Sequence, residues 1–462
     1  MTQQGRCRLP AEPDSAILDR LAGLHQVILP EQVRQALDAT GRVNPRACHL
    51  THEVMLWIVL AMGLLTDLPI RQVFKAARRL RVGEQTPCRS SLCEARKRLG
   101  VAPLRYLFHQ VVRPLATTAT PGAFYKDWHL VGIDGTVWDV PDSEANARVF
   151  GRPTGGRGDG SFPQIRKLSL VDLGTHAELA LVLKPCRRGE SSMVAGLLRH
   201  LRPGMLLLWD RNFFSYGLWQ TLCRRGIQIL ARVTSRLVLR PLRTLADGSY
   251  LAKIYPCPYD RDKDRHGIVV RVIRYTLDDP QRTGHGEEHV LLTTLLDAAT
   301  YPALELVLLY HERWEHELVY DEQKTHQDPR RATKPAQVRS ETPAGVVQEV
   351  LALALGHFVT RALMVEAARP LGLDVDRLSF LGCLHILRCR LPECDSQTPQ
   401  ALQHWYQAVL WEMGQEQIER RRNRINPRVV KRKMSKFKKK RPEHRPAPRL
   451  TQTFIETVVL RI

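Results

Sequence analysis

The segment from residue 128 to residue 233 most constrains the fold, because strand-like apolar runs alternate there with short helical patterns. Runs of Val, Leu and Ile bounded by Gly and Asp are typical of buried strands. The order is three strands, a helix, a strand, a helix and a strand. The expected strands are 128–136, 164–173, 176–184, 205–210 and 227–233, and the expected helices are 190–201 and 215–223. This order predicts an open α/β sheet.

The rest of the chain extends that pattern on both sides. The sheet order describes a ribonuclease-H-like core, and helical patterns precede and follow it. Four further strand patterns separated by polar turns lie between the core and a long helix. We therefore expect a helical N-terminal domain at 1–120, a first core part at 121–233, a β-rich insertion at 234–300, a core helix at 301–330, a C-terminal helical region at 331–418 and a basic tail at 419–462.

The charge balance indicates a polyanionic partner. Lys and Arg number 69 against 47 Asp and Glu, which gives a net charge of +22 and a pI near 9.9. The stretch 420–445 alone holds 14 Lys and Arg and one acid, yet the remaining body is still basic. Such an excess favours nucleic acid first and an acidic membrane surface second.

Two short helices about a turn are expected between residues 68 and 100, and the second carries Arg96, Lys97 and Arg98. That helix could lie against a DNA backbone, and a basic surface helix in a bundle is the alternative. The longest apolar run, Val54 to Leu65, is too short to cross a bilayer and predicts a buried helix. Dispersed cysteines and a polar N-terminal stretch favour a cytoplasmic protein without a membrane partner.

A polar stripe runs along the expected core helix. Tyr310, Arg313, Glu317, Asp321 and Lys324 are three or four residues apart, so they fall on one face of a helix. A carboxylate between fixed cations could hold a divalent ion beside a phosphate. The alternative is a solvated face with weak Glu-to-Lys pairs.

Two aspartates complete a possible carboxylate set. Asp134 and Asp210 each stand at the expected end of a core strand, where α/β sheets build their sites. Each alone is more often a turn-former or a helix cap. Together with Glu317 they offer hard oxygen ligands suited to Mg²⁺, and two such ions would activate a water or a 3′-hydroxyl and stabilise the departing oxygen.

These segments resemble the DDE transposases of the insertion-sequence-four family. The family's first Asp lies in an Asp-Gly-Thr strand end, here IDGT, and its second in a strand end of the type found here as WDRNFFS. Its third acid lies in a signature of Tyr, two residues, Arg, three residues, Glu, six residues and Lys. Tyr310, Arg313, Glu317 and Lys324 satisfy every spacing. Including LWIVLAMGLLTDLPIRQVF and PRVVKRKMSKF, the resemblance covers roughly residues 30–440.

The resemblance implies a cut-and-paste transposase with a ribonuclease-H-like catalytic core that a β-strand insertion interrupts. It implies that Asp134, Asp210 and Glu317 are catalytic ligands of two Mg²⁺ ions, for which Mn²⁺ can substitute. It also implies DNA contacts by Tyr310, Arg313 and Lys324, and a synaptic dimer. Arg211 and Asn212, beside Asp210, could also contact DNA, with a cap and an ion pair as the alternative.

The implied reaction is cleavage at the terminal inverted repeats and joining of the freed 3′-hydroxyl to target DNA. Characterised relatives form a hairpin and hold a flipped base on an insertion-domain Trp. Here residues 220–300 contain no Trp, and four tyrosines, at 250, 255, 259 and 275, offer the aromatic faces. The alternatives are a ribonuclease-H-like DNA-binding protein or a nuclease without strand transfer. For a bacterial transposase we expect association with the nucleoid.

Overall fold

A computed structural model describes residues 14–44, 50–79, 85–155, 158–234, 236–280, 285–328, 338–394, 398–419, 429–430, 438–439 and 452–461. The lysine-rich tail, and with it most of the PRVVKRKMSKF segment, therefore lies largely outside the described residues.

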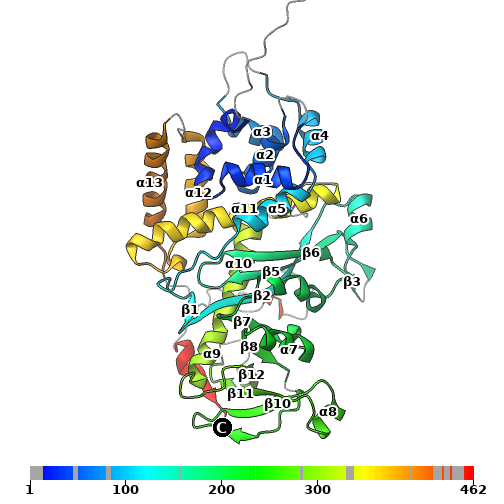
Figure 1. The fold of residues 1–462 in the computed structure, drawn as a ribbon, viewed down its shortest axis with the longest axis vertical. Helices are drawn as coiled ribbons and strands as arrows, with labels where there is room; N and C mark the ends of the chain where they lie inside the picture. The colour runs from blue at the N-terminus through cyan, green and yellow to red at the C-terminus, as the bar shows by residue number, and fades with distance from the viewer. Residues whose placement is uncertain are drawn as a thin grey trace, which may run out of the picture.

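A mixed sheet runs through the molecule, with helices packed at one end and on both faces (Figure 1). Strand β2 is antiparallel to β5, which is antiparallel to β6, whereas β2, β7 and β8 are parallel neighbours. Across the sheet the strands follow the order β6-β5-β2-β7-β8. Numbered one to five along the chain, this is the order 3-2-1-4-5, which confirms the predicted ribonuclease-H-like core. Their bounds are β2 Trp128–Asp139, β5 Gln164–Asp172, β6 Glu178–Pro185, β7 Met205–Trp209 and β8 Gln228–Val233.

The strands expected as an insertion extend this sheet. Strand β12 (His289–Thr293) pairs antiparallel with β8, and the order then continues through β11 (Ile268–Leu277), β10 (Tyr250–Ile254) and the short β9 (Arg243–Thr244). The last described segment forms a helical turn, α14 (Phe454–Thr457), and a strand, β15 (Val458–Leu460), that pairs with β11. Backbone hydrogen bonds thus tie the expected insertion and the chain end to the core.

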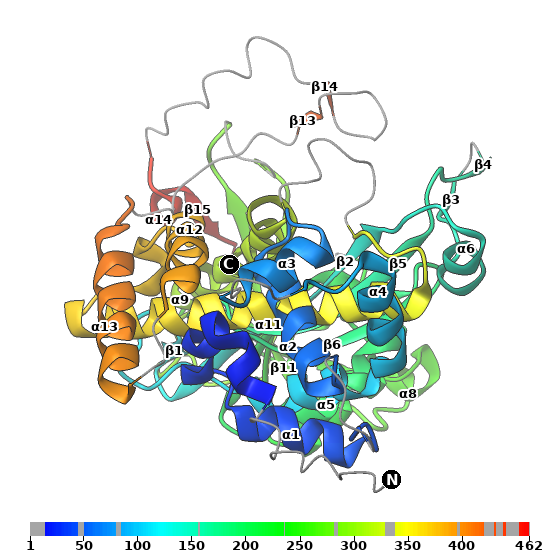
Figure 2. The same cartoon turned by 90° about the horizontal axis from the view of Figure 1, so that it is seen from above.

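Helices from both ends of the chain form one block. The 26-residue α11 (Pro343–Ala368) crosses α2 (His52–Leu64), and Figure 2 shows it running through the middle of the helical layer. Gly63 and Gly356 permit the close crossing, because a Cβ on Gly63 would lie 2.0 Å from the Ala352 carbonyl oxygen. The other helices of the block are α1 Pro30–Ala39, α3 Ile70–Ala76, α4 Arg89–Leu99, α5 Ala102–Val111, α12 Phe380–Arg390 and α13 Pro399–Gln415.

Burial explains the composition of these two helices. Almost every residue of α2 and α11 is inaccessible to solvent, so neither shows the one-sided pattern of a surface helix. By length and composition α11 could cross a membrane, yet 94% of its most apolar window is buried inside the protein. It is the central helix of the core.

Several local predictions need correction. The helix expected at 190–201 is two short 3₁₀ segments, η2 (Glu190–Gly196) and η3 (Leu198–His200), because its serines and Gly196 favour an α-helix weakly. The strand expected to end at Asp134-Gly135-Thr136 continues to Asp139, since β5 pairs with it over that whole length. On the other side of β2, pairing with β7 stops at Ile133.

Candidate active site

The end of β7 brings two aspartates together. Ile133 of β2 and Trp209 of β7 are the last partners in their parallel register, so Asp134 and Asp210 follow on adjacent strands. Asp210 leaves the sheet and caps the short helix η4 (Arg211–Phe213), accepting a hydrogen bond from Arg211 N at 2.7 Å. The parallel register therefore places the two aspartates on adjacent strands, although their motifs are 76 positions apart in the sequence.

Asp134 is poorly solvated and only partly neutralised. Its Oδ1 accepts from Gly135 N at 2.8 Å, and its Oδ2 lies 3.4 Å from Arg313 Nη1. Burial raises the pKa of Asp134 to about 6, against the lowering effect of Arg313, and the charges of Glu190 and Asp210 add to the rise. The effect of burial on this carboxyl thus outweighs that of the one guanidinium beside it.

Gly135 has a steric reason to lack a side chain. A Cβ there would lie 2.4 Å from Cδ of Glu190, whose carboxylate binds Arg166 Nη1 at 2.6 Å. Because successive residues point to opposite faces of a strand, Glu190 lies behind the face that carries Asp134. Only the Gly of the Asp-Gly-Thr motif could have pointed to this fourth acid.

The third acid stands on a segmented helix. Its parts are α9 Ala303–His311, η5 Glu312–Trp314, α10 Glu315–Asp321 and the π-helical η6 Glu322–Gln327. Two tyrosines fasten it to the sheet: Tyr310 donates to the Trp209 carbonyl at 3.2 Å, and Tyr320 donates to the Asp134 carbonyl at 2.6 Å. The helix is thus attached beside both aspartates. Tyr320 was not singled out in the sequence, where nothing but helical spacing marks it.

Arg313 joins the acids. Its Nη1 lies 3.4 Å from Asp134 Oδ2 and its Nη2 lies 3.8 Å from Glu317 Oε1. Burial lowers the pKa of Arg313, but nearby Tyr310 and the charges of Asp134, Asp210 and Glu317 outweigh it and raise the pKa. The Arg313 side chain is 9% exposed and that of Glu317 is 48% exposed. One buried guanidinium is therefore shared between Asp134 and Glu317, and Glu317 reaches further into solvent.

Lys324 lies along β2 on the side of Asp134. Its Nζ donates to Thr136 Oγ1 and, at 2.8 Å, to the Val137 carbonyl. The Asp-Gly-Thr motif thus contacts the helix signature through its Thr as well as its Asp. Asp321, which the stripe also contained, points away: its half-exposed carboxylate lies 3.5 Å from His326 Nε2.

The remaining expected contact residues lie at the surface of the site or outside it. Arg211 and Asn212 are exposed on η4, directly after Asp210. Among the insertion tyrosines, Tyr275 is buried, whereas Tyr259 on the short helix α8 (Pro258–Asp262) is 62% exposed. The Tyr255 hydroxyl donates to Asp264 at 2.8 Å, and the Tyr250 hydroxyl accepts from Arg274 at 3.1 Å.

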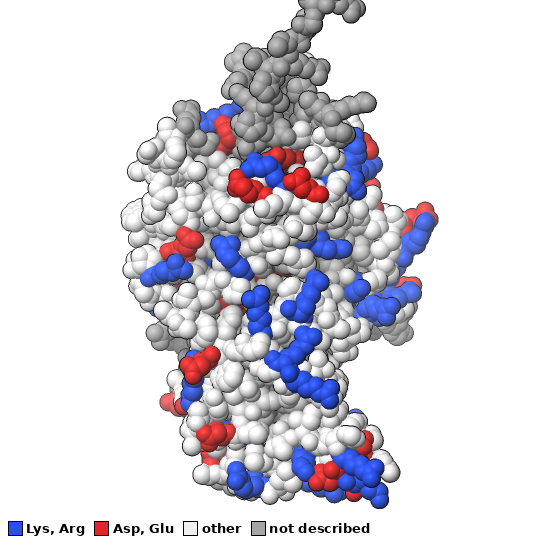
Figure 3. Space-filling model, in the orientation of Figure 1, with Lys and Arg blue, Asp and Glu red and all other residues white. Residues whose placement is uncertain are grey.

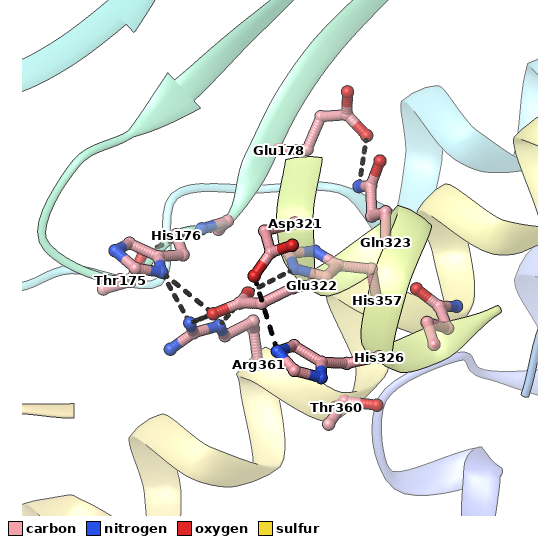
Figure 4. Close-up of polar contacts among 12 residues, drawn as sticks. Thr175, His176, Glu178, Asp321, Glu322, Gln323, His326, His357, Thr360 and Arg361 are labelled. Atoms are coloured by element: carbon pink, nitrogen blue, oxygen red, sulfur yellow. Dashed lines mark hydrogen bonds and ion pairs between the residues drawn. The ribbon is translucent and has the colours of Figure 1, made fainter. Parts of the chain in front are cut away.

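A buried charge cluster anchors the π-helical turn (Figure 4). Glu322, five residues after Glu317, is 2% exposed and lies 2.8 Å from His357 Nε2. Arg361 donates to both Glu322 oxygens, through Nε at 3.0 Å and through Nη2. Burial raises the pKa of Glu322, but Arg361 and His176 outweigh it and hold the pKa well below its usual value. This acid is fully neutralised.

Neighbouring residues of the turn are held as firmly. Gln323 accepts from buried Lys167 at 2.7 Å, and Lys167 is paired with Glu178 at 2.7 Å. Gln327 donates to the carbonyls of Gly63 and Leu353, where α2 and α11 cross. π-Helical turns are often found at functional sites. Here the turn buries Glu322 and Gln323 while Lys324 faces β2.

His176, Glu315 and Asp376 offer atoms within 4.8 Å of one another, a spacing that a metal ion could bridge. Burial and Arg361 lower the pKa of His176, but Asp376, Glu315 and Glu322 outweigh them and raise it to about 10. The charged imidazole is already paired, with Nε2 3.0 Å from Glu315 and 3.4 Å from Asp376. We therefore interpret this group as a hydrogen-bonded part of the buried cluster.

The donor set beside β7 fits a divalent cation better. Asp134, Asp210 and Glu317 offer only carboxylate oxygens, the ligands that Mg²⁺ and Mn²⁺ prefer. Burial is the main cause of the raised pKa of Asp134, with smaller contributions from the charges of Glu190 and Asp210. A bound divalent ion would stabilise the charged form of these carboxylates.

The chain was compared with known proteins. Two family models match it: the insertion element 4 transposase N-terminal family over residues 18–109 and the transposase DDE domain over residues 130–354. Over 433 residues the chain is 27% identical to transposase InsG for insertion sequence element IS4 from Escherichia coli (strain K12), covering 90% of this chain and 93% of InsG. It is 26% identical over 200 residues to the putative transposase InsZ from the same strain, covering 42% of this chain and 65% of InsZ. A solved piggyBac transposase synaptic complex with hairpin DNA aligns over 85% of each chain with a TM-score of 0.45 and 12% identity.

Proposed function

This chain belongs to the insertion-sequence-four family of DDE transposases, and we propose that it cleaves DNA at the terminal inverted repeats of its insertion element and joins the ends to target DNA. The observation that carries the proposal is the meeting of the three acids. The β2–β7 register sets Asp134 beside Asp210, and Arg313 links Asp134 to Glu317.

Asp134, Asp210 and Glu317 would hold Mg²⁺, or Mn²⁺ in its place. When bound, such ions supply charge stabilisation at the phosphate and lower the pKa of the attacking water or 3′-hydroxyl. The protein's own part is positioning, because phosphoryl transfer depends mostly on alignment and charge neutralisation. Asp134 is fixed by the hydrogen bond from Gly135 N, by the pairing of β2 with β5 at this position and by its pairing with β7 up to Ile133, so one ligand is rigid before DNA arrives.

The cations of the signature would receive the DNA phosphates. Arg313 is held by acids at 3.4 and 3.8 Å, long enough for a phosphate oxygen to compete for its donors. Lys324 would leave Thr136 and Val137 and bind a phosphate of the DNA strand. Tyr310 would act through Trp209, because its hydroxyl fixes the end of the strand that precedes Asp210.

Exposed groups next to the acids would extend the contact. Arg211 and Asn212 follow Asp210 on η4 and would bind the backbone on either side of the cut phosphate. Tyr259 is the most exposed of the four insertion tyrosines and would be the aromatic face for a flipped base if a hairpin forms. A synaptic dimer on paired ends and association with the bacterial nucleoid follow from this proposal.

The test is a cleavage and joining assay. Purified protein is incubated with Mg²⁺, labelled duplex carrying the repeats that flank its gene, and a supercoiled target. We expect nicking at the repeat ends and joined products, both lost with Asp210→Asn while binding of the duplex persists. Binding without nicking would identify a DNA-binding protein, nicking without joining would identify a nuclease, and Mg²⁺-dependent cleavage by Asp210→Asn would overturn the site.

A further inference from the structure

A group of exposed arginines lies on the face of the sheet opposite α10, and we call it the arginine face: Arg105, Arg199, Arg202 and Arg225, with His109 and His200. Arg199 Nη2 lies 3.3 Å from His109 Nε2, and Arg199 Nε donates to His200 Nε2 at 3.0 Å. The two imidazoles stack at 5.5 Å between ring centroids. Helix α5 of the N-terminal block and η3 of the core thus build one surface together.

Its position follows from the strand geometry. Gly135 faces Glu190 of η2, whereas the neighbouring Gly132 and Asp134 face His316 and Tyr320 of α10. The segment that follows η2 carries Arg199 and Arg202, and Arg225, at the end of α7 (Tyr216–Arg224), donates to the Leu198 carbonyl at 2.7 Å. The arginine face therefore lies behind the sheet as seen from Glu317.

Few acids occur in the segments that build the arginine face. Residues 102–126 contain no Asp or Glu, and residues 184–226 contain only Glu190, paired with Arg166, and Asp210 of the candidate active site. Within the described part of the chain none of the four arginines forms an ion pair with a carboxylate. Figure 3 shows Lys and Arg running down the centre of this side of the molecule, with acids mostly at its edges.

The histidines report the same excess. Burial, helped by Arg199 and Arg105, lowers the pKa of His109. Burial, with the charges of Arg199, His109 and Arg202, lowers the pKa of His200 to about 4. Other surface arginines differ, since Arg34, Arg148 and Arg390 each lie within 2.8 Å of a carboxylate oxygen. Like charges gathered without counter-charge favour binding of a polyanion.

We propose that the arginine face binds the phosphate backbone of duplex DNA at a second position, away from the phosphate being cut. The proposal rests on the proposed function, which makes DNA the available polyanion. Duplex DNA fits because guanidinium groups recognise phosphate oxygens and such contacts need no base sequence. Its place behind the sheet means that the DNA held here is a different segment from the one entering between Asp134 and Glu317.

The experiment removes the charge without touching the acids. A triple variant, Arg105→Gln with Arg199→Gln and Arg202→Gln, is compared with the unaltered protein for binding to a labelled mixed-sequence duplex across a range of salt. Each lost phosphate contact lowers the slope of log affinity against log salt by about 0.9, so we expect a decrease of about 2 to 3. Mg²⁺-dependent cleavage of a short repeat-end duplex should keep its rate at saturating DNA.

Two matched variants keep the outcome interpretable. Changing Arg34, Arg148 and Arg390 to Gln removes the same charge from acid-paired positions and should leave the slope unchanged. Changing Arg105, Arg199 and Arg202 to Lys instead of Gln should restore most of the salt slope that the Gln triple variant loses. The proposal is overturned if the Gln triple keeps the original slope, if the control triple lowers it equally, or if Lys fails to restore it. If the unaltered protein binds duplex but never cuts repeat ends, the proposed function is wrong, whereas the proposed DNA binding by the arginine face is not contradicted.

Discussion

Glu317 and Glu322 lie five residues apart on one helical segment, yet their surroundings are opposite. Glu317 is half exposed, and it lies 3.8 Å from Arg313, which also contacts Asp134. Glu322 is buried and is contacted by Arg361 and His357. The Glu317 carboxylate is therefore accessible to a ligand, whereas the Glu322 carboxylate is neutralised by its partners in the protein interior.

The difference shows how one segment serves both chemistry and anchoring. Buried charges are tolerated only when they are paired and hydrogen-bonded, which makes the Glu322 cluster costly to disrupt. A carboxylate that reaches solvent, as Glu317 does, costs less and can take up a cation. The π-helical turn separates the two, because it starts at Glu322 and leaves Glu317 on the preceding α-helical turn.

The largest expected effect is the loss of catalysis when Glu317 is changed. Glu317→Gln should lower the rate of repeat-end cleavage by at least about 1,000-fold, because loss of a metal ligand removes several kcal/mol of transition-state stabilisation. The thermal midpoint should hardly move, since the side chain is half exposed. Asp321→Asn, at another half-exposed acid of the same segment, is the control and should cleave normally. A Glu317→Gln enzyme within tenfold of the original rate would remove Glu317 from the site.

A change at the buried Glu322 should instead lower the stability of the fold. Glu322→Gln should destabilise the fold by about 3–5 kcal/mol, because it leaves the buried Arg361 without its partner. Urea unfolding followed by far-UV circular dichroism measures this. Combining it with Arg361→Met should recover part of the loss, since the two residues interact directly. A loss below about 1 kcal/mol for Glu322→Gln alone would mean that the cluster does not anchor the helix.

Asp134 should make stability depend on pH in the opposite direction to a paired acid. Its pKa is raised to about 6, so the folded state holds a proton that the unfolded chain releases near pH 4. Stability should therefore fall as pH rises from about 4 to about 6 and stay lower above that. Asp134→Asn, measured in chelator, should be more stable than the unaltered protein at pH 8 by on the order of 2 kcal/mol and nearly equal at pH 4. Equal stabilities at both pH values would contradict the raised pKa.

Glu322 sets the contrast for that measurement. Because its pKa is held well below the usual value, its contribution is present above about pH 4.5 and is lost only as pH falls further. The Glu322→Gln loss should therefore persist from pH 8 to pH 5.

Lys324 should give the smallest of these effects. Its hydrogen bonds to Thr136 and Val137 in the free protein indicate a cation ready to move to a phosphate. A hydrogen bond to a charged group contributes about 1.5–3 kcal/mol, so Lys324→Met should lower kcat/KM about 10- to 100-fold. Single-turnover cleavage measures this, and Lys324→Arg should recover part of the rate. Full activity in Lys324→Met would assign the lysine to structure alone.

Local sequence was informative where the physics is local. Apolar alternation marked the strands, and the spacing of Tyr310, Arg313, Glu317 and Lys324 marked one helical face before any contact was known. It failed where propensity is weak, as in η2 and η3, and where pairing decides an element's length, as in β2 beyond Asp134. It could not show that the expected β-rich insertion pairs with the core sheet, because the β8–β12 pairing leaves no mark in either strand.

The sequence by itself determined the order of most elements, because periodicity acts over a few residues, and its resemblance to the family's motifs predicted Asp134, Asp210 and Glu317 as the acids of the site. Only the tertiary structure decided that Asp134 adjoins Asp210, that Glu190 lies behind Gly135, that Glu322 is buried against Arg361, and that Arg199 reaches His109. Each of these contacts joins residues that are between 39 and 90 positions apart. The free energy of such a contact depends on burial and on charges supplied by other segments, which no single stretch of sequence contains.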